Sequence, residues 1–152
     1  MSGEPIFFDT WGWVAFFNKG DEHHAKTTEL WRALRGTPTP LITSWPVIQE
    51  TVGFACSSRG RREWDKDGGL AVSKALMSFA ESELLAAVMV PSETDMNESL
   101  QLRVQHGSIP DLSLTDCTIA VMLRRVPRAR LLSGDHHFRT LCPGTPLIPA
   151  SW

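Results

Sequence analysis

Two short stretches, Ile6-Phe7-Phe8-Asp9-Thr10 and Leu131-Leu132-Ser133-Gly134-Asp135, decide the fold of this chain. Each is an apolar run that ends abruptly on an aspartate, which is the pattern of a short buried strand with a carboxylate at its C-terminal end. In open α/β sheets, ligands bind outside the carboxyl ends of the strands. Two such acids, from opposite ends of the chain, predict a shared acidic site and therefore a metal ion.

Short apolar runs alternate with helical patterns along the rest of the chain. Strands are expected over about 6–9, 41–43, 84–90, 129–133 and 147–148. Helices are expected over about 13–17, 23–34, from 44 onward, and over 72–82, 91–105, 113–125 and 137–141, with 57–69 as a polar loop or a frayed helix end. We therefore predict the α/β class: one domain over residues 1–152, with a central, mostly parallel sheet of about four or five strands and helices on both faces.

Length and composition are those of an ordinary globular chain, because 152 residues with 42% hydrophobic side chains can bury a core. No apolar run approaches the roughly 20 residues that span a bilayer. Since no signal segment opens the chain, we expect no membrane role and a cytoplasmic location. Cys56, Cys117 and Cys142 have neither zinc spacing nor a disulfide framework. The net charge of −2 argues against broad electrostatic binding of nucleic acid, but not against a local basic patch.

Two further acids fall on apolar helical faces. Glu50 has Val47 three residues before it and Phe54 four residues after it, and these offsets place all three on one face. Asp116 is followed by apolar residues three, four and seven positions later, so it lies on the apolar stripe of its own helix. A carboxylate that points toward the core is costly unless it is paired or bound to a cation.

The residue types indicate which cation such a cluster would bind. Ligands that offer only oxygen suit a hard ion such as Mg²⁺ or Mn²⁺, whereas zinc prefers His or Cys. Mg²⁺ usually keeps several waters and binds through a few carboxylates together with substrate phosphate. One retained water could be deprotonated and attack a phosphodiester in line.

Each acid also has a simpler structural interpretation. Asp9 and Asp135 could cap the helices that follow them, because Asp is a good N-cap residue. Glu50 and Asp116 could lie at the flank of their stripes and reach solvent. Together, four acids at strand ends and on core-facing stripes favour a site, although the sequence alone does not show that they meet in space.

The order of these motifs resembles that of PIN-domain ribonucleases, particularly the toxins of VapBC-type toxin–antitoxin pairs. Each motif is weak alone, but the four follow one another in order and cover nearly the whole chain. The matching segments are Ile6-Phe7-Phe8-Asp9-Thr10, Thr43-Ser44-Trp45-Pro46-Val47-Ile48-Gln49-Glu50, Leu112-Ser113-Leu114-Thr115-Asp116-Cys117 and Leu131-Leu132-Ser133-Gly134-Asp135-His136-His137-Phe138.

The resemblance implies a Mg²⁺- or Mn²⁺-dependent endoribonuclease acting on tRNA, rRNA or mRNA. It implies that Asp9, Glu50, Asp116 and Asp135 form the acidic quartet. Within it, the three aspartates would contact the metal and Glu50 would hold or orient metal-bound water. The implied hydroxyls near the site are those of Thr10, Thr115 and Ser133.

Several residues near the quartet in sequence, or with matching chemistry, have possible roles. Gly134 stands where the family often has Asn, a change that we expect to be tolerated. His136 and His137 are not predicted as ligands. Four arginines are candidates for phosphate contacts, because guanidinium groups match phosphate oxygens; the alternative is an ordinary solvated charged face. They are Arg59, Arg61, Arg62 and Arg139.

The predicted partners follow from the same resemblance: an RNA substrate, a cognate antitoxin and a second copy of the chain. Trp11, Trp13, Phe16 and Phe17 concentrate aromatic area near the N-terminus. We expect Phe16 in the core and at least one of the tryptophans at a dimer face or in a groove for an antitoxin helix. Two alternatives stay open: a related nuclease without a toxin role, acting in RNA processing or on DNA, and a PIN-like binding module without catalysis.

Overall fold

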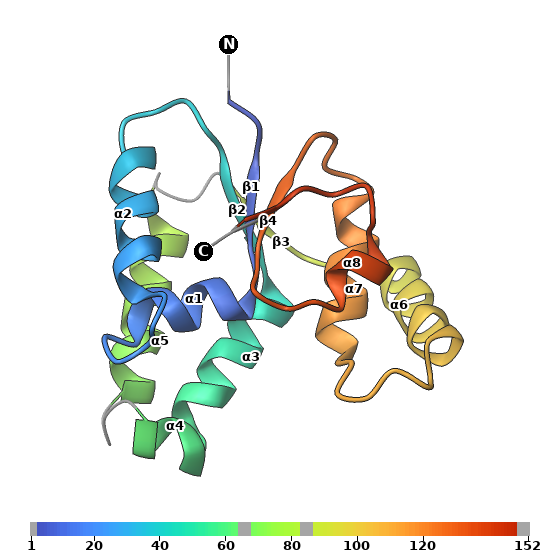
Figure 1. Ribbon diagram of the computed structural model, residues 1–152, viewed down its shortest axis with the longest axis horizontal. Helices are drawn as coiled ribbons and strands as arrows, with labels where there is room; N and C mark the ends of the chain where they lie inside the picture. Colours follow the sequence, from blue (N-terminus) through green and yellow to red (C-terminus); the bar gives the residue numbers. More distant parts are fainter. Residues whose placement is uncertain (1–2, 64–67, 83–86, 149–152) are drawn as a thin grey trace.

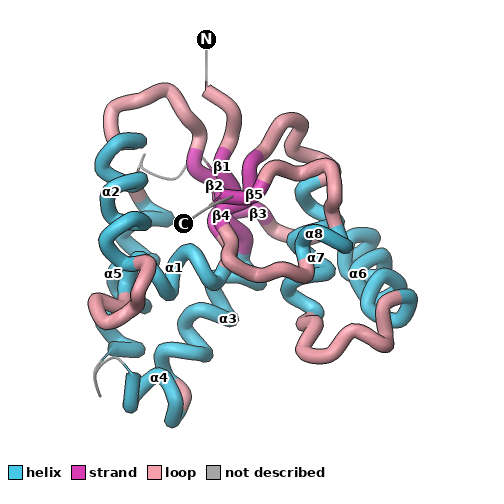
Figure 2. The backbone as a smooth tube through the Cα atoms, viewed as in Figure 1, coloured by secondary structure: helices cyan, strands magenta, loops and turns pink. Residues whose placement is uncertain are grey.

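Five short strands form a parallel sheet at the centre of the structure (Figures 1 and 2). The computed structural model describes residues 3–63, 68–82 and 87–148. Within them the strand order is β3-β2-β1-β4-β5, and every neighbouring pair is parallel. The predicted sheet of four or five mostly parallel strands is confirmed. The strands are β1 (Ile6–Phe8), β2 (Leu41–Ser44), β3 (Ala87–Met89), β4 (Arg130–Leu132) and β5 (Leu147–Ile148).

Helices cover both faces of this sheet, as the alternating pattern predicts. In Figure 1, α1, α2 and α5 lie on one side of the strands, and α6, α7 and α8 lie on the other. The helices are α1 (Thr10–Phe17), α2 (His24–Leu34), α3 (Trp45–Cys56), α4 (Ser58–Glu63), α5 (Gly68–Glu81), α6 (Glu93–Gln105), α7 (Leu114–Leu123) and α8 (Phe138–Leu141). Strands buried between two helical layers must be apolar along their whole length. Accordingly, all three residues of β1 and the last two of β4 have no exposed surface.

Of the two alternatives for 57–69, a polar loop or a frayed helix end, the loop is wrong. The described part of this segment forms the short helix α4 and the start of α5, which begins at Gly68 rather than near Val72; residues 64–67 lie outside the described residues. The glycines there suggested a break, but Gly69 serves packing instead. A Cβ atom at Gly69 would lie 2.4 Å from Sγ of Cys56, so only glycine lets α5 approach the end of α3 this closely.

Other boundaries differ by a few residues. The strand predicted over 84–90 is described only as Ala87–Met89, because residues 84–86 lie outside the described residues. The helix predicted to run to residue 125 ends at Leu123, and the strand predicted over 129–133 is Arg130–Leu132. Such shifts are expected, because terminal residues of an element depend on hydrogen bonds that composition does not reveal.

The early aromatic residues form a cluster on one face of the sheet. Trp13 is completely buried, and its Nε1 donates a 3.1 Å hydrogen bond to Oγ1 of Thr43. Phe16 is half-buried and packs against Trp31, with ring centroids 5.3 Å apart. Phe16 therefore contributes to the core as predicted, and so does Trp13. An interface role for a tryptophan from this segment stays a prediction, now restricted to the half-buried Trp11.

None of the helices in the described ranges combines the length and the apolar character that a bilayer crossing requires. The three cysteines are free thiols, and Cys117 is fully buried within α7.

Candidate active site

The order of the strands reverses between β1 and β4. Strands β1, β2 and β3 extend from the centre to one edge, and β4 and β5 then fill the other half. In open α/β sheets the crevice outside the carboxyl ends at such a reversal is the usual ligand site. Phe8 pairs with Leu132, so Asp9 and Asp135, which follow β1 and β4, stand at adjacent strand ends.

Asp9 is held rigidly by the turn from β1 into α1. It is the N-cap residue of α1, where its Oδ1 accepts a 2.6 Å hydrogen bond from the backbone N–H of Thr10. Its Oδ2 accepts a 2.6 Å hydrogen bond from Oγ of Ser133, across the β1–β4 pair. The proposed capping role is thus real, but it accounts for only one of the two carboxylate oxygens. Capping and membership of a site are compatible at this position.

The surroundings of Asp9 disfavour its charged form. The residue is only 3% exposed. Burial raises the pKa of Asp9 to about 7, and the charges of Asp116 and Glu50 act in the same direction, whereas the hydrogen bonds from Ser133 and Thr10 oppose the shift. A carboxylate whose neighbours are two further carboxylates gains the most from a bound cation.

Asp116 enters the same cluster from α7. It occupies the third position of that helix in a capping box: its Oδ2 accepts a 2.8 Å hydrogen bond from the backbone N–H of Ser113, and Oγ of Ser113 accepts one of 3.0 Å from the backbone N–H of Asp116. Burial raises the pKa of Asp116, the hydrogen bonds from Ser113 oppose this, and the charges of Asp135 and Glu50 raise it further.

Glu50 comes from the second turn of α3, half-buried beside α1. Its Oε2 accepts a hydrogen bond from Oγ1 of Thr10, the residue after Asp9. Glu50 also borders a groove of about 390 Å³ between α3 and the starts of α6 and α7. Thr115, which precedes Asp116 in α7, lines this groove. The lining residues are Pro46, Gln49, Glu50, Met96, Leu114, Thr115 and Thr118.

Asp135 is more accessible than Asp9 or Asp116, with 28% of its side chain exposed. It does not cap α8, contrary to the simpler interpretation, because the N-cap of that helix is His137. Instead, its Oδ1 accepts a 2.8 Å hydrogen bond from the backbone N–H of His137. Its own backbone N–H donates to Oγ of Ser133 over 3.1 Å, so one serine hydroxyl joins Asp9 to Asp135.

The structure places the four acids that the sequence singled out close enough to interact electrostatically, although they lie far apart in the chain. Asp9 interacts electrostatically with Asp116 and Glu50, and Asp116 interacts with Glu50 and Asp135. Four like charges at one sheet edge repel one another, and an oxygen-only donor set fits a hard divalent cation. The two predicted hydroxyls of Thr10 and Ser133 donate directly to members of the quartet.

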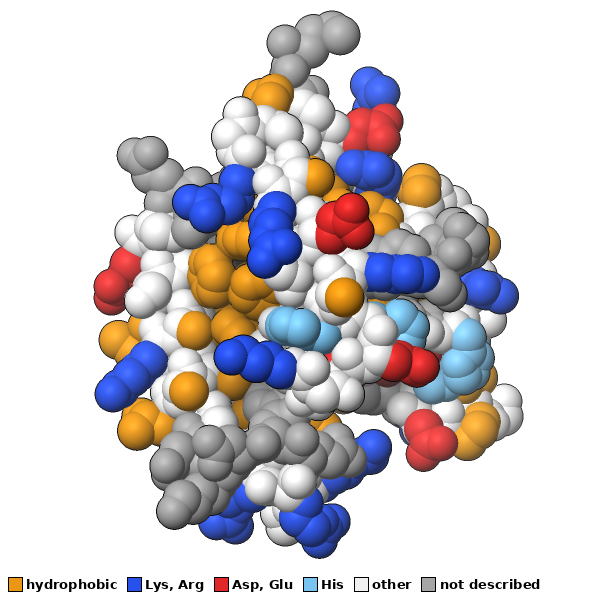
Figure 3. Space-filling model, turned by 60° about the vertical axis from the view of Figure 1, so that its left-hand side comes forward, with side chains coloured by type: hydrophobic (Ala, Val, Ile, Leu, Met, Phe, Trp, Pro, Cys, Tyr) orange, Lys and Arg blue, Asp and Glu red, His pale blue; other side chains and the backbone are white. Residues whose placement is uncertain are grey.

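The candidate arginines do not share this location. Arg59, Arg61 and Arg62 lie on α4, at the end of α3 that points away from the sheet (Figure 1), and Arg59 lies over the ring of Phe54 at 5.8 Å. Arg139 is exposed on α8, directly after the segment that holds Asp135. On the face drawn in Figure 3, basic side chains are spread out rather than gathered into one patch.

Two features escaped the sequence reasoning. Asp95 is not among the acids that the sequence singles out, yet it is only 6% exposed. The signal was present, because Ser92 stands three residues before Asp95, as Ser113 does before Asp116. The second feature is Trp11, which covers Gly134: a Cβ atom there would lie 2.5 Å from the indole ring. Glycine at this position thus leaves room for Trp11.

Comparison with known proteins supports the architecture. No protein-family model matches the sequence, and no curated protein matches it. Among solved structures, the crystal structure of Mycobacterium tuberculosis VapC20, a Sarcin-Ricin loop cleaving toxin, superposes with a TM-score of 0.71. The alignment covers 89% of this chain and 93% of that chain, at 21% sequence identity. The chain has a PIN-like fold. The resemblance drawn from the four ordered motifs is therefore confirmed at the level of the fold.

Proposed function

We propose that this protein is a metal-dependent endoribonuclease of the VapC-like toxin type. The observation that carries the proposal is the group of four carboxylates at the strand-order reversal of a PIN-like sheet, where burial and mutual repulsion raise the pKa of Asp9 to about 7. VapC20 is itself described as a toxin that cleaves the Sarcin-Ricin loop, which supports RNA as the substrate class. The proposed reaction is hydrolysis of a phosphodiester bond.

The donor set indicates how the site would work. Asp9, Asp116 and Asp135 would hold Mg²⁺ or Mn²⁺, because each presents a carboxylate to the shared cluster. When bound, the divalent ion supplies charge neutralisation and activation of water for attack on phosphate. Glu50 accepts the hydroxyl hydrogen of Thr10, so it is oriented by that bond and is placed to hold a water molecule. Ser133 links Asp9 and Asp135 through hydrogen bonds of its hydroxyl group. Thr115 lines the adjoining groove.

Phosphate contacts are proposed for Arg139, which lies near the quartet, and for the three arginines of α4, which lie farther away. Arg139 follows Asp135 on α8 and is the candidate for the phosphate next to the cleaved bond. Arg59, Arg61 and Arg62 would contact a more distant part of an extended RNA, because α4 lies at the far end of α3 (Figure 1). We further propose a cognate antitoxin that restrains the activity, a homodimer in solution and a cytoplasmic location.

The decisive test compares Asp9→Asn with the wild-type protein on structured RNA in the presence of Mn²⁺. The wild type should cleave and Asp9→Asn should not, because the amide cannot supply the missing negative charge. Asp95→Asn is the matched control, since Asp95 is a buried helix-start aspartate outside the quartet. Equal cleavage by the wild type and Asp9→Asn would refute the assignment. Competition between RNA and DNA separates the alternative nuclease, and a calorimetric titration without metal binding would favour the inactive module.

A further inference from the structure

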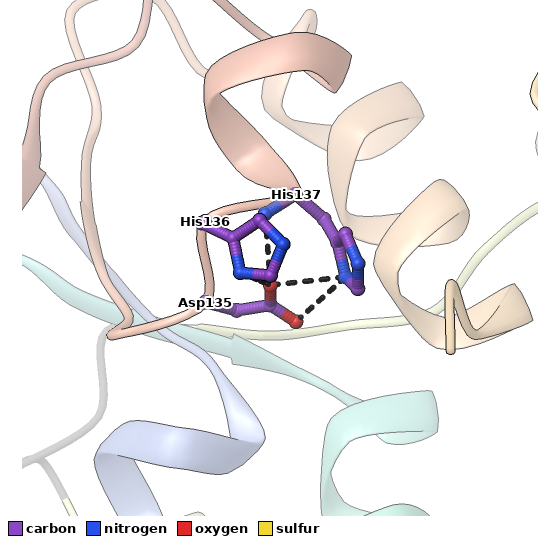
Figure 4. Close-up of side chains that lie close together, drawn as sticks. All are labelled: Asp135, His136 and His137. Carbon is purple, nitrogen blue, oxygen red and sulfur yellow. Dashed lines mark hydrogen bonds and ion pairs between the residues drawn. The ribbon is translucent and has the colours of Figure 1, made fainter. Parts of the chain in front are cut away.

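Two histidines adjoin the fourth acid of the quartet, and the proposed function leaves them without a role. Asp135, His136 and His137 lie in the turn between β4 and α8 with their side chains together (Figure 4). Nδ1 of His137 is 3.0 Å from Oδ1 and 3.2 Å from Oδ2 of Asp135, and Nδ1 of His136 is 3.9 Å from Oδ1. One potential ligand atom from each residue lies within 4.8 Å of the others.

These separations approach those of atoms bound to one ion. Nitrogen and oxygen ligands sit about 2.0–2.1 Å from a tetrahedral Zn²⁺, so two such ligand atoms lie roughly 3.3 Å apart. The two His137–Asp135 distances, 3.0 and 3.2 Å, are slightly shorter than this value. His136 needs only a side-chain rotation, and it is free to make one because 82% of its side chain is exposed. His137 is 8% exposed and fixed by packing, so the site combines one rigid and one adjustable imidazole.

The supporting contacts are also those of a metal site. Asp135 accepts the backbone N–H of His137 over 2.8 Å and donates its own N–H to Ser133, which orients the carboxylate. Ligand carboxylates in proteins are usually held by such outer hydrogen bonds. The neighbouring charge of Asp116 adds attraction for a cation. Three protein ligands would leave a further coordination position open, a common arrangement for zinc.

We propose that Asp135, His136 and His137 form a second metal site, selective for a nitrogen-preferring cation of the Zn²⁺ type. Two imidazole nitrogens and one carboxylate oxygen favour Zn²⁺ over Mg²⁺, whereas the four carboxylates favour Mg²⁺ or Mn²⁺. Both sites use Asp135, so they compete for it. Zn²⁺ bound to the histidines draws Asp135 away from the quartet and inhibits RNA cleavage, a consequence that rests on the proposed nuclease function.

Calorimetric titration of the full chain with ZnCl₂ tests the site without any activity measurement. The wild type should bind one equivalent, and Co²⁺ in its place should give the intense visible absorption of a tetrahedral site. His136→Ala should weaken Zn²⁺ binding by more than the roughly 10- to 100-fold that loss of an outer hydrogen bond costs. Because His136 is exposed, this variant should keep the thermal midpoint of the wild type, which separates lost ligation from lost folding.

His23→Ala is the matched control, because His23 is another histidine near acids, with Nδ1 3.5 Å from Oδ1 of Asp21. It should bind Zn²⁺ like the wild type. The proposal is overturned if His136→Ala binds Zn²⁺ as tightly as the wild type, or if His23→Ala shows the loss instead.

A cleavage assay then tests the inhibition separately. In Mn²⁺, added Zn²⁺ should inhibit the wild type more strongly than His136→Ala. If the protein cleaves no RNA, the proposed function fails while the titration still decides the zinc site. If it cleaves RNA but binds no Zn²⁺, only the present inference fails.

Discussion

The starts of α6 and α7 are built from the same local parts but lie in different electrostatic surroundings. Each helix has a serine at its N-cap and an aspartate at its third position, and each pair forms a reciprocal capping box. The two aspartates, Asp95 and Asp116, are equally buried, with 6% of their surface exposed. The two helices also pack against each other. Local geometry therefore does not distinguish them.

The charged groups around each aspartate distinguish Asp95 from Asp116. Oδ2 of Asp95 accepts hydrogen bonds from the backbone and side chain of Ser92, and from Nη2 of Arg125 at 2.6 Å. The backbone bond from Ser92, aided by its hydroxyl and the Arg125 charge, lowers the pKa of Asp95 despite burial. Asp116 faces Asp135 and Glu50 instead, and its pKa is raised. The charge of Asp95 is paired with that of Arg125, whereas Asp116 lies among further acids and is a proposed ligand of the cation.

The largest expected difference concerns activity. Asp116→Asn should lower Mn²⁺-dependent RNA cleavage by about 100-fold or more, because a carboxylate that holds the ion contributes several kcal/mol to the transition state. Asp95→Asn should cleave at a rate near that of the wild type, measured below its unfolding temperature. Comparable losses in both variants would mean that the two aspartates serve the same structural purpose.

Asp95→Asn and Asp116→Asn should change the stability of the metal-free protein in opposite directions. Asp95→Asn should lower the free energy of unfolding by about 1–3 kcal/mol, because it removes charge-assisted hydrogen bonds from a buried group. Asp116→Asn should raise it at pH 8, since the buried charge is no longer repelled by its neighbours. Urea denaturation in EDTA measures both changes. Destabilisation by Asp116→Asn would indicate that the quartet is compensated internally.

The stability of the metal-free protein should depend on pH in opposite ways through Asp9 and Asp95. Asp9 has a pKa of about 7 in the folded protein against an ordinary value of 3.8, so the folded state binds its proton more tightly than the unfolded state. This stabilisation is complete below about pH 4 and is lost as the pH rises toward 7. Asp95 behaves inversely: its stabilisation is present near neutral pH and is lost in acid. The thermal midpoint measured in EDTA should therefore decrease as the pH is raised from 5 to 7.5.

Two controls sharpen the pH measurement. Asp9→Asn should flatten the decline between pH 5 and pH 7.5, because it removes the titrating group. Mn²⁺ should restore the midpoint at pH 7.5, since the ion binds only the folded, ionised cluster. A wild-type midpoint that stays constant over this range in EDTA would contradict the burial of an uncompensated Asp9.

The smallest expected effect comes from the caps themselves. Ser92→Ala and Ser113→Ala should each cost about 1 kcal/mol of stability, the usual contribution of an N-cap side chain. Only Ser113→Ala should also weaken Mn²⁺ binding, because Ser113 orients Asp116. A calorimetric Mn²⁺ titration of both variants checks this, and equal affinities would show that Asp116 keeps its position without the cap.

Much of the fold and of the candidate site was predictable from the sequence, for physical reasons. Buried strands must be apolar throughout, so β1 and β4 are conspicuous, and the aspartates that follow them indicate the candidate site at that edge of the sheet. Glu50 and Asp116 are recognisable because helical periodicity places them on apolar faces. The quartet could therefore be assembled before its spatial arrangement was known.

The remaining features depend on contacts between segments distant in sequence. The residues near Asp95 in sequence do not predict its ion pair with Arg125, which lies just after the end of α7. The glycines at 68 and 69 suggest a break, and the close approach of Cys56 to Gly69 explains why glycine stands inside a helix there. Gly134 likewise has a reason only once Trp11 is seen to cover it.

The position of β4 in the sheet has a consequence for synthesis on the ribosome. Ile6 in β1 pairs with Leu41 on one side and with Arg130 on the other. At 5–20 residues per second, translation from residue 41 to residue 130 takes on the order of 5–20 s, and throughout that time one edge of β1 has no partner strand. Asp135 is synthesised after β4, so it is the last of the four acids to be added to the chain. The proposed nuclease site therefore stays incomplete until the segment after β4 has been synthesised.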